Sequence, residues 1–473
     1  MNSTTTYLLV LLVALSVGTP PARAEVPANG WITFASKRQD GRREIYLMKA
    51  DGAGVTRLTF DGGEDPKWSP NGAWIAYQKN DIGPTMVIRW DGSDKKQVHQ
   101  GQPMFWMQDG SGLVTNVGFD YYLVDPDTGK TKLLFKRDDF DQLRKRKASL
   151  VATGISRDGR WLIGQSTVYA GGNAGSNGMF DNTSSVVVLD FKDRSKVYYV
   201  GNGCEGTFNP AGTTMYHVRG LDAERDLYQL RTDDLKDRAS YKPEVAVPAA
   251  EFGYEYFPSV SNDGKWMAYG ATTGCHDHDN CDYEIFIHKI GTGPLGRTRV
   301  TTNTANDRWP SLWVGPLWKR PSQPLMKLGL QQLSLDPGTQ PGIQEVYNIG
   351  PGDLQPVTAS VAYADARGGW LKSVLAGSGN KQRIEHRVVV DGLPAGSYQA
   401  TVTLSAANAS NSVSYQVRLL THKTETISNV VPPDADLGGC AVGGVAQPQT
   451  GPLYPVMGLL VLVLLRRRRR PLS

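Results

Sequence analysis

The alternation of apolar and polar positions predicts an all-β chain built from short hairpins. The clearest stretch, residues 257–270, has two alternating segments on either side of Asn262-Asp263-Gly264. Gly264 can adopt the positive φ that a tight turn needs, and Asp263 can hydrogen-bond its own backbone. Residues 265–270 alternate as a half-buried strand does. The stretch therefore predicts one hairpin.

Copies of this inner hairpin recur about every 40 to 50 residues, which is the spacing of propeller blades. They begin at Asp65, Thr153 and Cys204, with a degenerate copy at Pro103 and a truncated one at Trp309. A second, outer hairpin pattern alternates with the first. It begins at Trp31, Met86, Tyr121, Val186, Asp226 and Tyr283.

The order of the hairpins predicts a closed ring. The repeats begin with an outer hairpin, residues 31–59, and end with an inner pair, residues 309–319. Neither has a partner beside it in sequence. If the two ends complete one blade together, no sheet edge stays exposed and the ring has six blades.

The motifs of these repeats resemble the TolB-like propeller family. The stretches EIYLMKADGAGVTRLTFDGGEDPKWSPNGAWIAY and DYEIFIHKIGTGPLGRTRVTTNTANDRWPSLW follow its pattern of I-Y, D-G, R-L-T and P-x-W-S-P-D-G. The resemblance covers residues 31–320 and implies a six-bladed propeller. A charged insertion at 137–148 and a Gly- and Asn-rich one at 170–181 leave the blade boundaries between 100 and 205 open.

The alternation changes after the linker at 321–324. From Leu325 onward, longer alternating segments predict a β-sandwich. The stretch VDGLPAGSYQATVTLSAANASNSVSYQVRL resembles the immunoglobulin-like BACON domain of bacterial surface proteins. The resemblance implies an immunoglobulin-like sandwich of about 95 residues.

The N-terminus has the pattern of an export signal. Residues 7–17 are a short apolar run, and Ala22-Arg23-Ala24 supplies a small-residue cleavage site before Glu25. No Lys or Arg precedes the run, which is a departure from the usual signal. The alternative is a buried hydrophobic strand.

The C-terminus combines three ordered features. Cys440 lies in a Gly-rich linker, residues 453–465 are apolar, and five arginines follow at 466–470. Together they resemble the MYXO-CTERM sorting signal, which implies cleavage near Cys440 by a membrane protease and display on the cell surface. The 13-residue run is shorter than the roughly 20 residues of an ordinary membrane span. The alternative is a plain transmembrane anchor with its arginines on the cytoplasmic side.

These patterns predict five segments. They are a signal peptide (1–24), a TolB-like propeller (25–320), an immunoglobulin-like sandwich (325–422), a linker with the sorting cysteine (423–450), and a transmembrane segment with its Arg-rich tail (451–473).

The charge balance argues against nucleic-acid binding. The formal net charge is +5, but Arg23 and the five terminal arginines belong to the end signals, which leaves a body at −1. The positive charge is therefore a topology signal rather than a basic binding surface.

One loop offers candidate metal ligands. Cys275 and Cys281 are six residues apart and predict a disulfide in an exported protein. The four residues His276, Asp277, His278 and Asp279 lie between them and could hold a divalent metal, although their spacing fits no standard zinc or calcium motif. The alternative is a solvated loop held by the disulfide, with no cofactor. Cys204 is left over as a buried thiol.

Catalytic motifs are scarce in the sequence. Neither G-x-S-x-G nor a phosphate-binding G-x-x-x-x-G-K-[ST] occurs. Oligogalacturonate lyases share TolB-like repeats and use His and metal ligands, so His217 and His288 are candidates by residue type. Five tryptophans at comparable repeat positions either pack between blades or line a carbohydrate-binding channel. They are Trp68, Trp106, Trp161, Trp266 and Trp309.

The sequence thus predicts an exported, surface-displayed, non-catalytic binding protein. Its propeller would bind an envelope protein or glycan, and its tail would meet a sorting protease and the membrane. The alternatives are a secreted propeller lyase acting on polysaccharide and a structural surface protein. An intact channel with convergent histidines would favour the lyase, and a channel plugged by apolar side chains would favour the structural protein.

Overall fold

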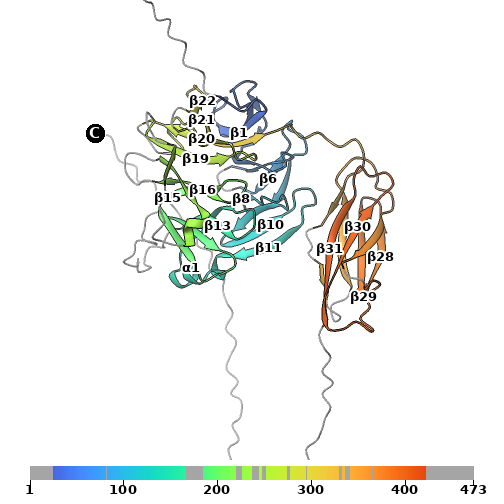
Figure 1. Cartoon of the computed structure of the whole chain (residues 1–473). Coiled ribbons are helices and arrows are strands. Elements are labelled where there is room, and N and C mark those ends of the chain that lie inside the picture. Colours follow the sequence, from blue (N-terminus) through green and yellow to red (C-terminus); the bar gives the residue numbers. More distant parts are fainter. Residues whose placement is uncertain are drawn as a thin grey trace, which may run out of the picture. The chain divides into compact units, whose positions relative to one another are not determined.

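The computed structural model describes residues 25–421, apart from 81–82, 167–184, 220–225, 237–243, 248–251, 274–276, 294–295, 330–332, 336–340 and 365–366. Among these residues the chain is almost entirely β (Figure 1). The exceptions are one α-helix, α1 (Asp141–Arg146), and two 3-10 turns, η1 (Arg137–Asp139) and η2 (Thr232–Lys236). η1 and α1 form the charged insertion that interrupts the repeats.

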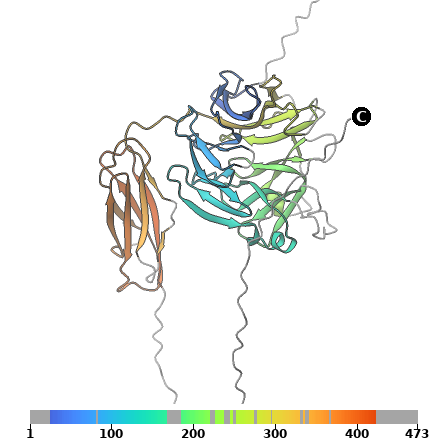
Figure 2. The same ribbon diagram turned by 180° about the vertical axis from the view of Figure 1, so that it is seen from behind.

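Six four-stranded antiparallel blades succeed one another along the chain, as the blue-to-yellow sheets of Figures 1 and 2 show. From the innermost strand outward, blade 1 is β23 (Arg308–Val314), β1 (Gly30–Ser36), β2 (Glu44–Lys49) and β3 (Thr56–Arg57). Blade 2 is β4 (Glu64–Trp68), β5 (Ile75–Gln78), β6 (Thr85–Ile88) and β7 (Lys96–His99). Blade 3 is β8 (Gln102–Trp106), β9 (Leu113–Val117), β10 (Asp120–Val124) and β11 (Thr131–Lys136).

The other three blades follow the same order. Blade 4 is β12 (Val151–Ile155), β13 (Trp161–Ser166), β14 (Ser185–Asp190) and the first part of β15 (Val197–Phe208). Blade 5 is the last part of β15, then β16 (Thr214–Arg219), β17 (Asp226–Arg231) and β18 (Glu244–Val247). Blade 6 is β19 (Tyr254–Val260), β20 (Trp266–Thr272), β21 (Glu284–Lys289) and β22 (Arg297–Arg299).

The ring is closed by the two ends of the repeat region, as the order of the hairpins predicted. The innermost strands contact one another in the sequence β4, β8, β12, β15, β19, β23 and back to β4. β23 pairs with β1, with Trp313 opposite Trp31 and Leu312 opposite Ile32. The expectation of a pair of closing strands at 309–319 is wrong, however. β23 is a single strand, because β1 already occupies the position beside it.

The hairpin turn at 261–264 forms as expected and explains the recurring S-x-[DN]-G letters. Ser261 O accepts from Gly264 N at 2.9 Å, and Ser261 Oγ accepts from Trp266 N at 3.1 Å. Ser261 Oγ in turn donates to Asp263 at 2.5 Å, and Gly264 has a φ of 72°. The same bonds recur around Ser69 and Ser156.

β15 resolves the boundary that the sequence left open between residues 100 and 205. Its first half pairs with β14, with Tyr198 opposite Val188, and its second half pairs with β16, with Cys204 opposite Val218. One continuous strand is therefore the outer edge of blade 4 and the inner edge of blade 5, without a loop between the two blades.

The residues after the linker form a β-sandwich of two four-stranded sheets, drawn in orange in Figure 1. One sheet is β24 (Met326–Leu328), β26 (Gly342–Asn348), β29 (Lys381–Val388) and β28 (Leu371–Ser378). The other is β25 (Leu333–Leu335), β31 (Val413–Thr421), β30 (Gly396–Ser405) and β27 (Thr358–Tyr363). Alternate residues of β30 are buried, which places Ala400, Val402 and Leu404 in one apolar core with Trp370.

The two end signals and Cys440 lie outside the described residues. In the part of the chain that the structure describes, no helix is long and apolar enough to cross a membrane.

Candidate functional site

A central cavity runs between the innermost strands of the six blades. Its volume is about 370 Å³, and every blade contributes residues from β4, β8, β12, β15, β19 or β23 to its lining. Pockets of 300 to 1,000 Å³ are the usual size for small ligands. This cavity is therefore large enough to hold part of a ligand, and its wall determines what could bind.

Each innermost strand is interrupted at the same level by a β-bulge. The pairing between the first and second strands of every blade shifts by one residue there, so one strand carries an extra residue. Bulges redirect side chains and are frequent next to functional sites. The residues at the six bulges all line the cavity, and they are Asp65, Met104, Thr153, Glu205, Phe257 and Trp309. We call these six residues the bulge ring.

Four residues of the bulge ring have a left-handed backbone. The φ angles are 48° for Asp65, 51° for Glu205, 59° for Phe257 and 51° for Trp309. Such conformations cost about 1 to 3 kcal/mol each for residues other than glycine, and they cluster at ligand sites. A purely structural barrel would gain nothing from repeating this cost around its axis.

The prolines of the repeat motif explain why the bulges form. Pro66, Pro258 and Pro310 each follow a left-handed residue of the bulge ring, and Gly206 has this place in blade 5. Proline lacks the N–H that a regular ladder requires, so within a sheet it is confined to edges and bulges. Hydrophobic periodicity does not indicate the bulge ring, although the residue before each motif proline marks three of its members.

Two carboxyl groups of the bulge ring come from blades 2 and 5, which are opposite each other in a ring of six. Asp65 forms an ion pair with Lys67 on the same strand. Glu205 accepts a hydrogen bond from the backbone N–H of Phe257 at 2.6 Å. Burial raises the pKa of Glu205 to about 8; the Phe257 N–H, Lys67 and Arg308 oppose this rise, and Asp65 adds to it. The side chain of Glu205 is therefore mostly protonated at neutral pH.

An aromatic wall completes the ring on the side of blades 6 and 1. The rings of Phe257 and Trp309 meet edge to face, with their centroids 5.5 Å apart. The guanidinium of Arg308 lies 3.7 Å from the centre of the Trp309 ring. Trp309 is thus held in place by a cation–π contact, which fixes the orientation of the wall.

Behind Trp309, a buried ion cluster joins blades 1, 2 and 6. Arg308 Nη2 lies 3.2 Å from Glu64 Oε2, and Arg43 pairs with the other oxygen of Glu64. Both arginines also reach Asp279 Oδ1, at 2.9 Å from Arg308 and 2.6 Å from Arg43. Burial and the neighbouring Arg43 lower the pKa of Arg308. Two arginines therefore face two carboxylates, and Lys37 lies beside them, with its Nζ donating to the backbone carbonyl of Asp279 at 3.1 Å.

The loop expected to hold a metal is tied to this cluster. Asp277 caps its own turn by accepting from Asp279 N at 2.8 Å, and the carboxylate of Asp279 is engaged by Arg43 and Arg308. The His278 ring packs against Tyr256, 4.5 Å between centroids. Among the described residues, no group of three or more His, Cys, Asp or Glu side chains is placed to hold a metal. His276 lies outside them.

The cysteines are placed in part. Cys281 is disulfide-bonded. Cys275, its predicted partner, lies outside the described residues, so that pairing stays a prediction. Cys204 forms no disulfide and is half-buried rather than buried.

Neither candidate histidine of a lyase lines the cavity. His217 on β16 and His288 on β21 are both buried, and burial lowers the pKa of each to about 4. They lie one or two strands away from the cavity wall.

The five tryptophans do not share one repeat position, contrary to expectation. Trp68 and Trp106 end innermost strands, whereas Trp161 and Trp266 begin second strands and are buried within the blades. Only Trp309 belongs to the bulge ring. Trp68, Trp106 and Trp309 line the cavity.

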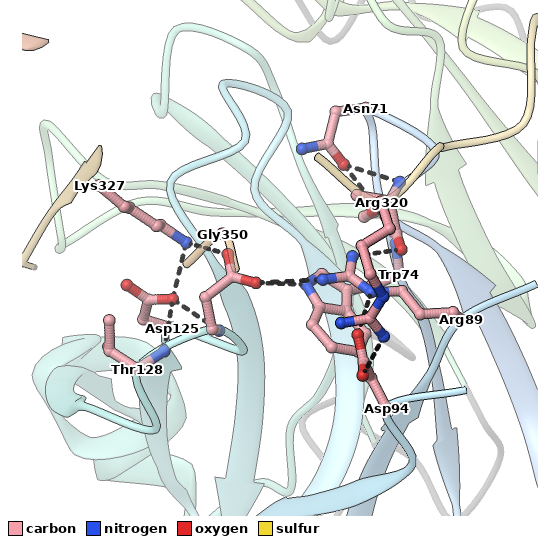
Figure 3. A network of polar contacts seen from close by, with 12 residues as sticks. Asn71, Trp74, Arg89, Asp94, Asp125, Thr128, Arg320, Lys327 and Gly350 are labelled. Atoms are coloured by element: carbon pink, nitrogen blue, oxygen red, sulfur yellow. Dashed lines mark hydrogen bonds and ion pairs between the residues drawn. The ribbon is translucent and has the colours of Figure 1, made fainter. Parts of the chain in front are cut away.

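Another arginine, Arg89 at the end of β6, holds the segment that leaves the ring (Figure 3). Its guanidinium lies 3.3 Å from the ring centre of Trp74 and 3.8 Å from that of Trp318. Arg320, two residues beyond Trp318, reaches Asp94 at 2.6 Å.

Figure 3 also shows Lys327 beside Asp125, at 2.7 Å. Burial acts to lower the pKa of Lys327, but Asp127 and Asp125 outweigh it and raise the pKa.

Comparison with known proteins finds similar folds but no family. No family model matches the chain, and no curated protein matches it. Among solved structures, a TolB from Agrobacterium tumefaciens is 13% identical with a TM-score of 0.41, over 62% of this chain and 99% of that one. The propeller domain of the Trilobed protease from Pyrococcus furiosus is 10% identical with a TM-score of 0.37, over 60% and 97%. A regucalcin from Agrobacterium tumefaciens, described as calcium-binding, is 13% identical with a TM-score of 0.33, over 51% and 75%.

Proposed function

We propose that this chain is an exported, surface-displayed, non-catalytic binding protein that takes part of an envelope protein or glycan into the cavity of its propeller. The observation that carries the proposal is the bulge ring. Six unlike side chains are turned into one cavity by the same irregularity in six strands, and four of them have a strained backbone. Strain that recurs at one level of a fold is typical of a binding surface.

The lining distinguishes this proposal from the two alternatives. A lyase of the kind weighed above would need its histidines at the cavity, and neither His217 nor His288 lines it. A structural protein would be expected to fill its axis with apolar side chains. The wall instead includes Asp65, Lys67 and Glu205 around open space, which supports binding over both.

The place of action is a further part of the proposal and rests on the sequence of the two ends. The export signal would bring the chain across the membrane, and the sorting signal around Cys440 would deliver it to the surface. We expect Cys440→Ala to leave folding and export intact but to block processing, so that the arginines at 466–470 are retained. Intact mass and cell fractionation in a host with the sorting protease measure this. Equal masses for wild type and variant would replace the sorting role with a plain anchor.

Filling the cavity tests the binding site itself. Thr153→Trp and Met104→Trp each place a large side chain in the bulge ring from neighbouring blades. Thr358→Trp, on an exposed position of β27 in the sandwich, is the matched control. Full-length protein with either filled cavity should lose at least tenfold in affinity for its envelope ligand, measured on isolated envelope glycan and envelope protein fractions, while the control binds like wild type. Met104 is 8% exposed, so Met104→Trp also lowers the melting temperature, and binding is measured well below that temperature. Unchanged binding by both filled variants would place the site elsewhere.

A further inference from the structure

The charges at the cavity cancel within the protein. Asp65 is paired with Lys67, and Arg308 and Arg43 are balanced by Glu64 and Asp279. The remaining ionisable member of the bulge ring is Glu205, whose burial favours its neutral form. A buried charge without a partner is costly, so a ligand with a net charge would find no counter-ion here.

Glu205 is built to act as a neutral carboxylic acid. One oxygen, Oε2, is held by the N–H of Phe257 at 2.6 Å, which fixes the direction of the group. A protonated carboxyl has an O–H that donates and retains an oxygen that accepts. Phe257 on the adjacent blade 6 is 5% exposed, and Trp309 on blade 1, which contacts it, is half-buried; both line the cavity and add apolar ring surface to its wall.

We propose that the cavity binds a neutral saccharide unit, with Glu205 donating a hydrogen bond to a ligand oxygen. The proposal rests on the proposed function and names its ligand class. A pyranose ring has an apolar face of C–H groups and an edge of hydroxyl groups. The aromatic wall suits the face, and Glu205, Thr153 and the lining amide Gln165 suit the edge.

This arrangement makes binding depend on pH through Glu205. The charged side chains that influence it from other strands are Asp65 and Lys67 on β4 and Arg308 on β23. The strands beside β15 also carry Tyr216, His217 and Arg219 on β16 and Glu255 and Tyr256 on β19. Burial raises the pKa of Tyr216 and lowers that of His217 to about 4. Neither of those two groups therefore changes charge between pH 7 and pH 9.

The first experiment measures affinity against pH. Full-length protein is screened on an array of neutral, uronic-acid and amino-sugar oligosaccharides, and the best neutral one is titrated by calorimetry at pH 7 and pH 9. Wild-type affinity should fall roughly tenfold, because a group with a pKa of about 8 passes from mostly neutral to mostly ionised over this interval. Glu205→Gln keeps a neutral donor and an acceptor for the Phe257 N–H, so its affinity should be independent of pH.

The second experiment reverses the charge selectivity. Asp65→Asn removes the partner of Lys67 while keeping a residue that tolerates a left-handed backbone. The variant should gain at least fivefold in affinity for uronic-acid oligosaccharides at low salt. Asp65→Asn combined with Lys67→Met restores neutrality and should restore the preference for neutral sugars. Raising the salt concentration should reduce the gain in affinity of Asp65→Asn for uronic-acid oligosaccharides, because salt screens the charge of Lys67. It should leave the affinity of the double variant unchanged.

The outcomes separate the ligand class from the binding role. Wild-type preference for charged sugars or for peptides, absence of any sugar binding, or a wild-type affinity that does not change with pH would each overturn the neutral-saccharide proposal. If the tryptophan-filled cavities still abolish binding of envelope material in those cases, the proposed function survives. If they do not, both proposals fail.

Discussion

The first and second strands of each blade form an irregular ladder, whereas the second and third strands form a regular one. The pairing is shifted between β23 and β1, β4 and β5, and the equivalent pairs of all six blades. It is unbroken one step further out, from β1–β2 through β20–β21. The outermost ladder is also shifted in blades 2 to 5. The ladder between the second and third strands is thus the regular one, and the ladder at the cavity is irregular in every blade.

This division of labour predicts that stability and binding can be changed separately. Substitutions behind the innermost strands should lower stability without altering the affinity of the molecules that remain folded. Substitutions in the bulge ring should mainly change the affinity for the ligand when the pH is held constant.

The largest loss of stability is expected at the buried ion cluster behind Trp309. Glu64→Ala leaves Arg43 and Arg308 in a buried position with Asp279 alone, and Asp279 is 64% exposed. Losing one partner of a buried ion group costs about 3 to 5 kcal/mol. Chemical denaturation should show this loss. The matched control is Asp61→Ala, which breaks exposed pairs with Lys79 and Lys95 and should cost less than about 1 kcal/mol. If Glu64→Ala and Asp61→Ala lower the free energy of unfolding equally, the buried cluster contributes no more to stability than an exposed ion pair does.

The next largest loss of stability is expected in the regular ladder between the second and third strands. Ile287 in β21 is fully buried, between blades 6 and 1. Ile287→Ala should cost about 2 to 5 kcal/mol through lost burial and the cavity left behind. Ligand affinity, measured well below the melting temperature, should stay within about twofold of wild type. A large loss of affinity would contradict the separation of the two ladders.

A smaller effect is expected at the disulfide of Cys281. Cys281→Ser opens a loop that, with Cys275 as partner, holds seven residues, and loop-closure entropy puts the cost at about 2 kcal/mol. Because the loop is tied to the ion cluster, Cys281→Ser and Glu64→Ala should show non-additive losses in a double-mutant cycle. Mass mapping that finds Cys281 bound to another cysteine would change the loop and the size of the effect.

A pH-dependent effect on stability is expected at Glu205. Its pKa is higher in the folded protein, about 8, than the ordinary 4.5 of an unfolded chain, so the folded state binds the extra proton between those values. Wild-type stability should therefore decline as pH rises from about 5 to 8. Glu205→Gln should remove this decline, so its melting temperature should gain on wild type by a few degrees over that interval. Parallel curves for the two proteins would show that Glu205 is ionised throughout.

Whether a feature could be predicted from the sequence depends on how far apart in the chain its interacting residues lie. The turns formed as expected because Ser261, Asp263 and Gly264 act within five residues of one another. Ring closure was predictable from hairpin order, since only one partner for β1 remained. The bulges were not predicted, because register is set by pairing between strands, and the positive φ of Asp65 or Glu205 leaves no mark on periodicity. The expected alignment of Trp161 with Trp68 failed because Trp68 precedes the turn that begins at Ser69, whereas Trp161 follows the turn that begins at Ser156.

The way the chain leaves the ring also determines how the molecule responds to mechanical load. β23 pairs antiparallel with β1, so a pull along the axis of β23 would load the hydrogen bonds of that ladder together in shear rather than open them one at a time. A load from the C-terminal side meets the ion pair of Arg320 with Asp94, at 2.6 Å, before it reaches Trp318, which is stacked on Arg89 and whose carbonyl accepts from Trp90 Nε1 at 2.7 Å. Such a load would therefore act on the contacts that Arg320 and Trp318 make with blade 2 before it acts on β23.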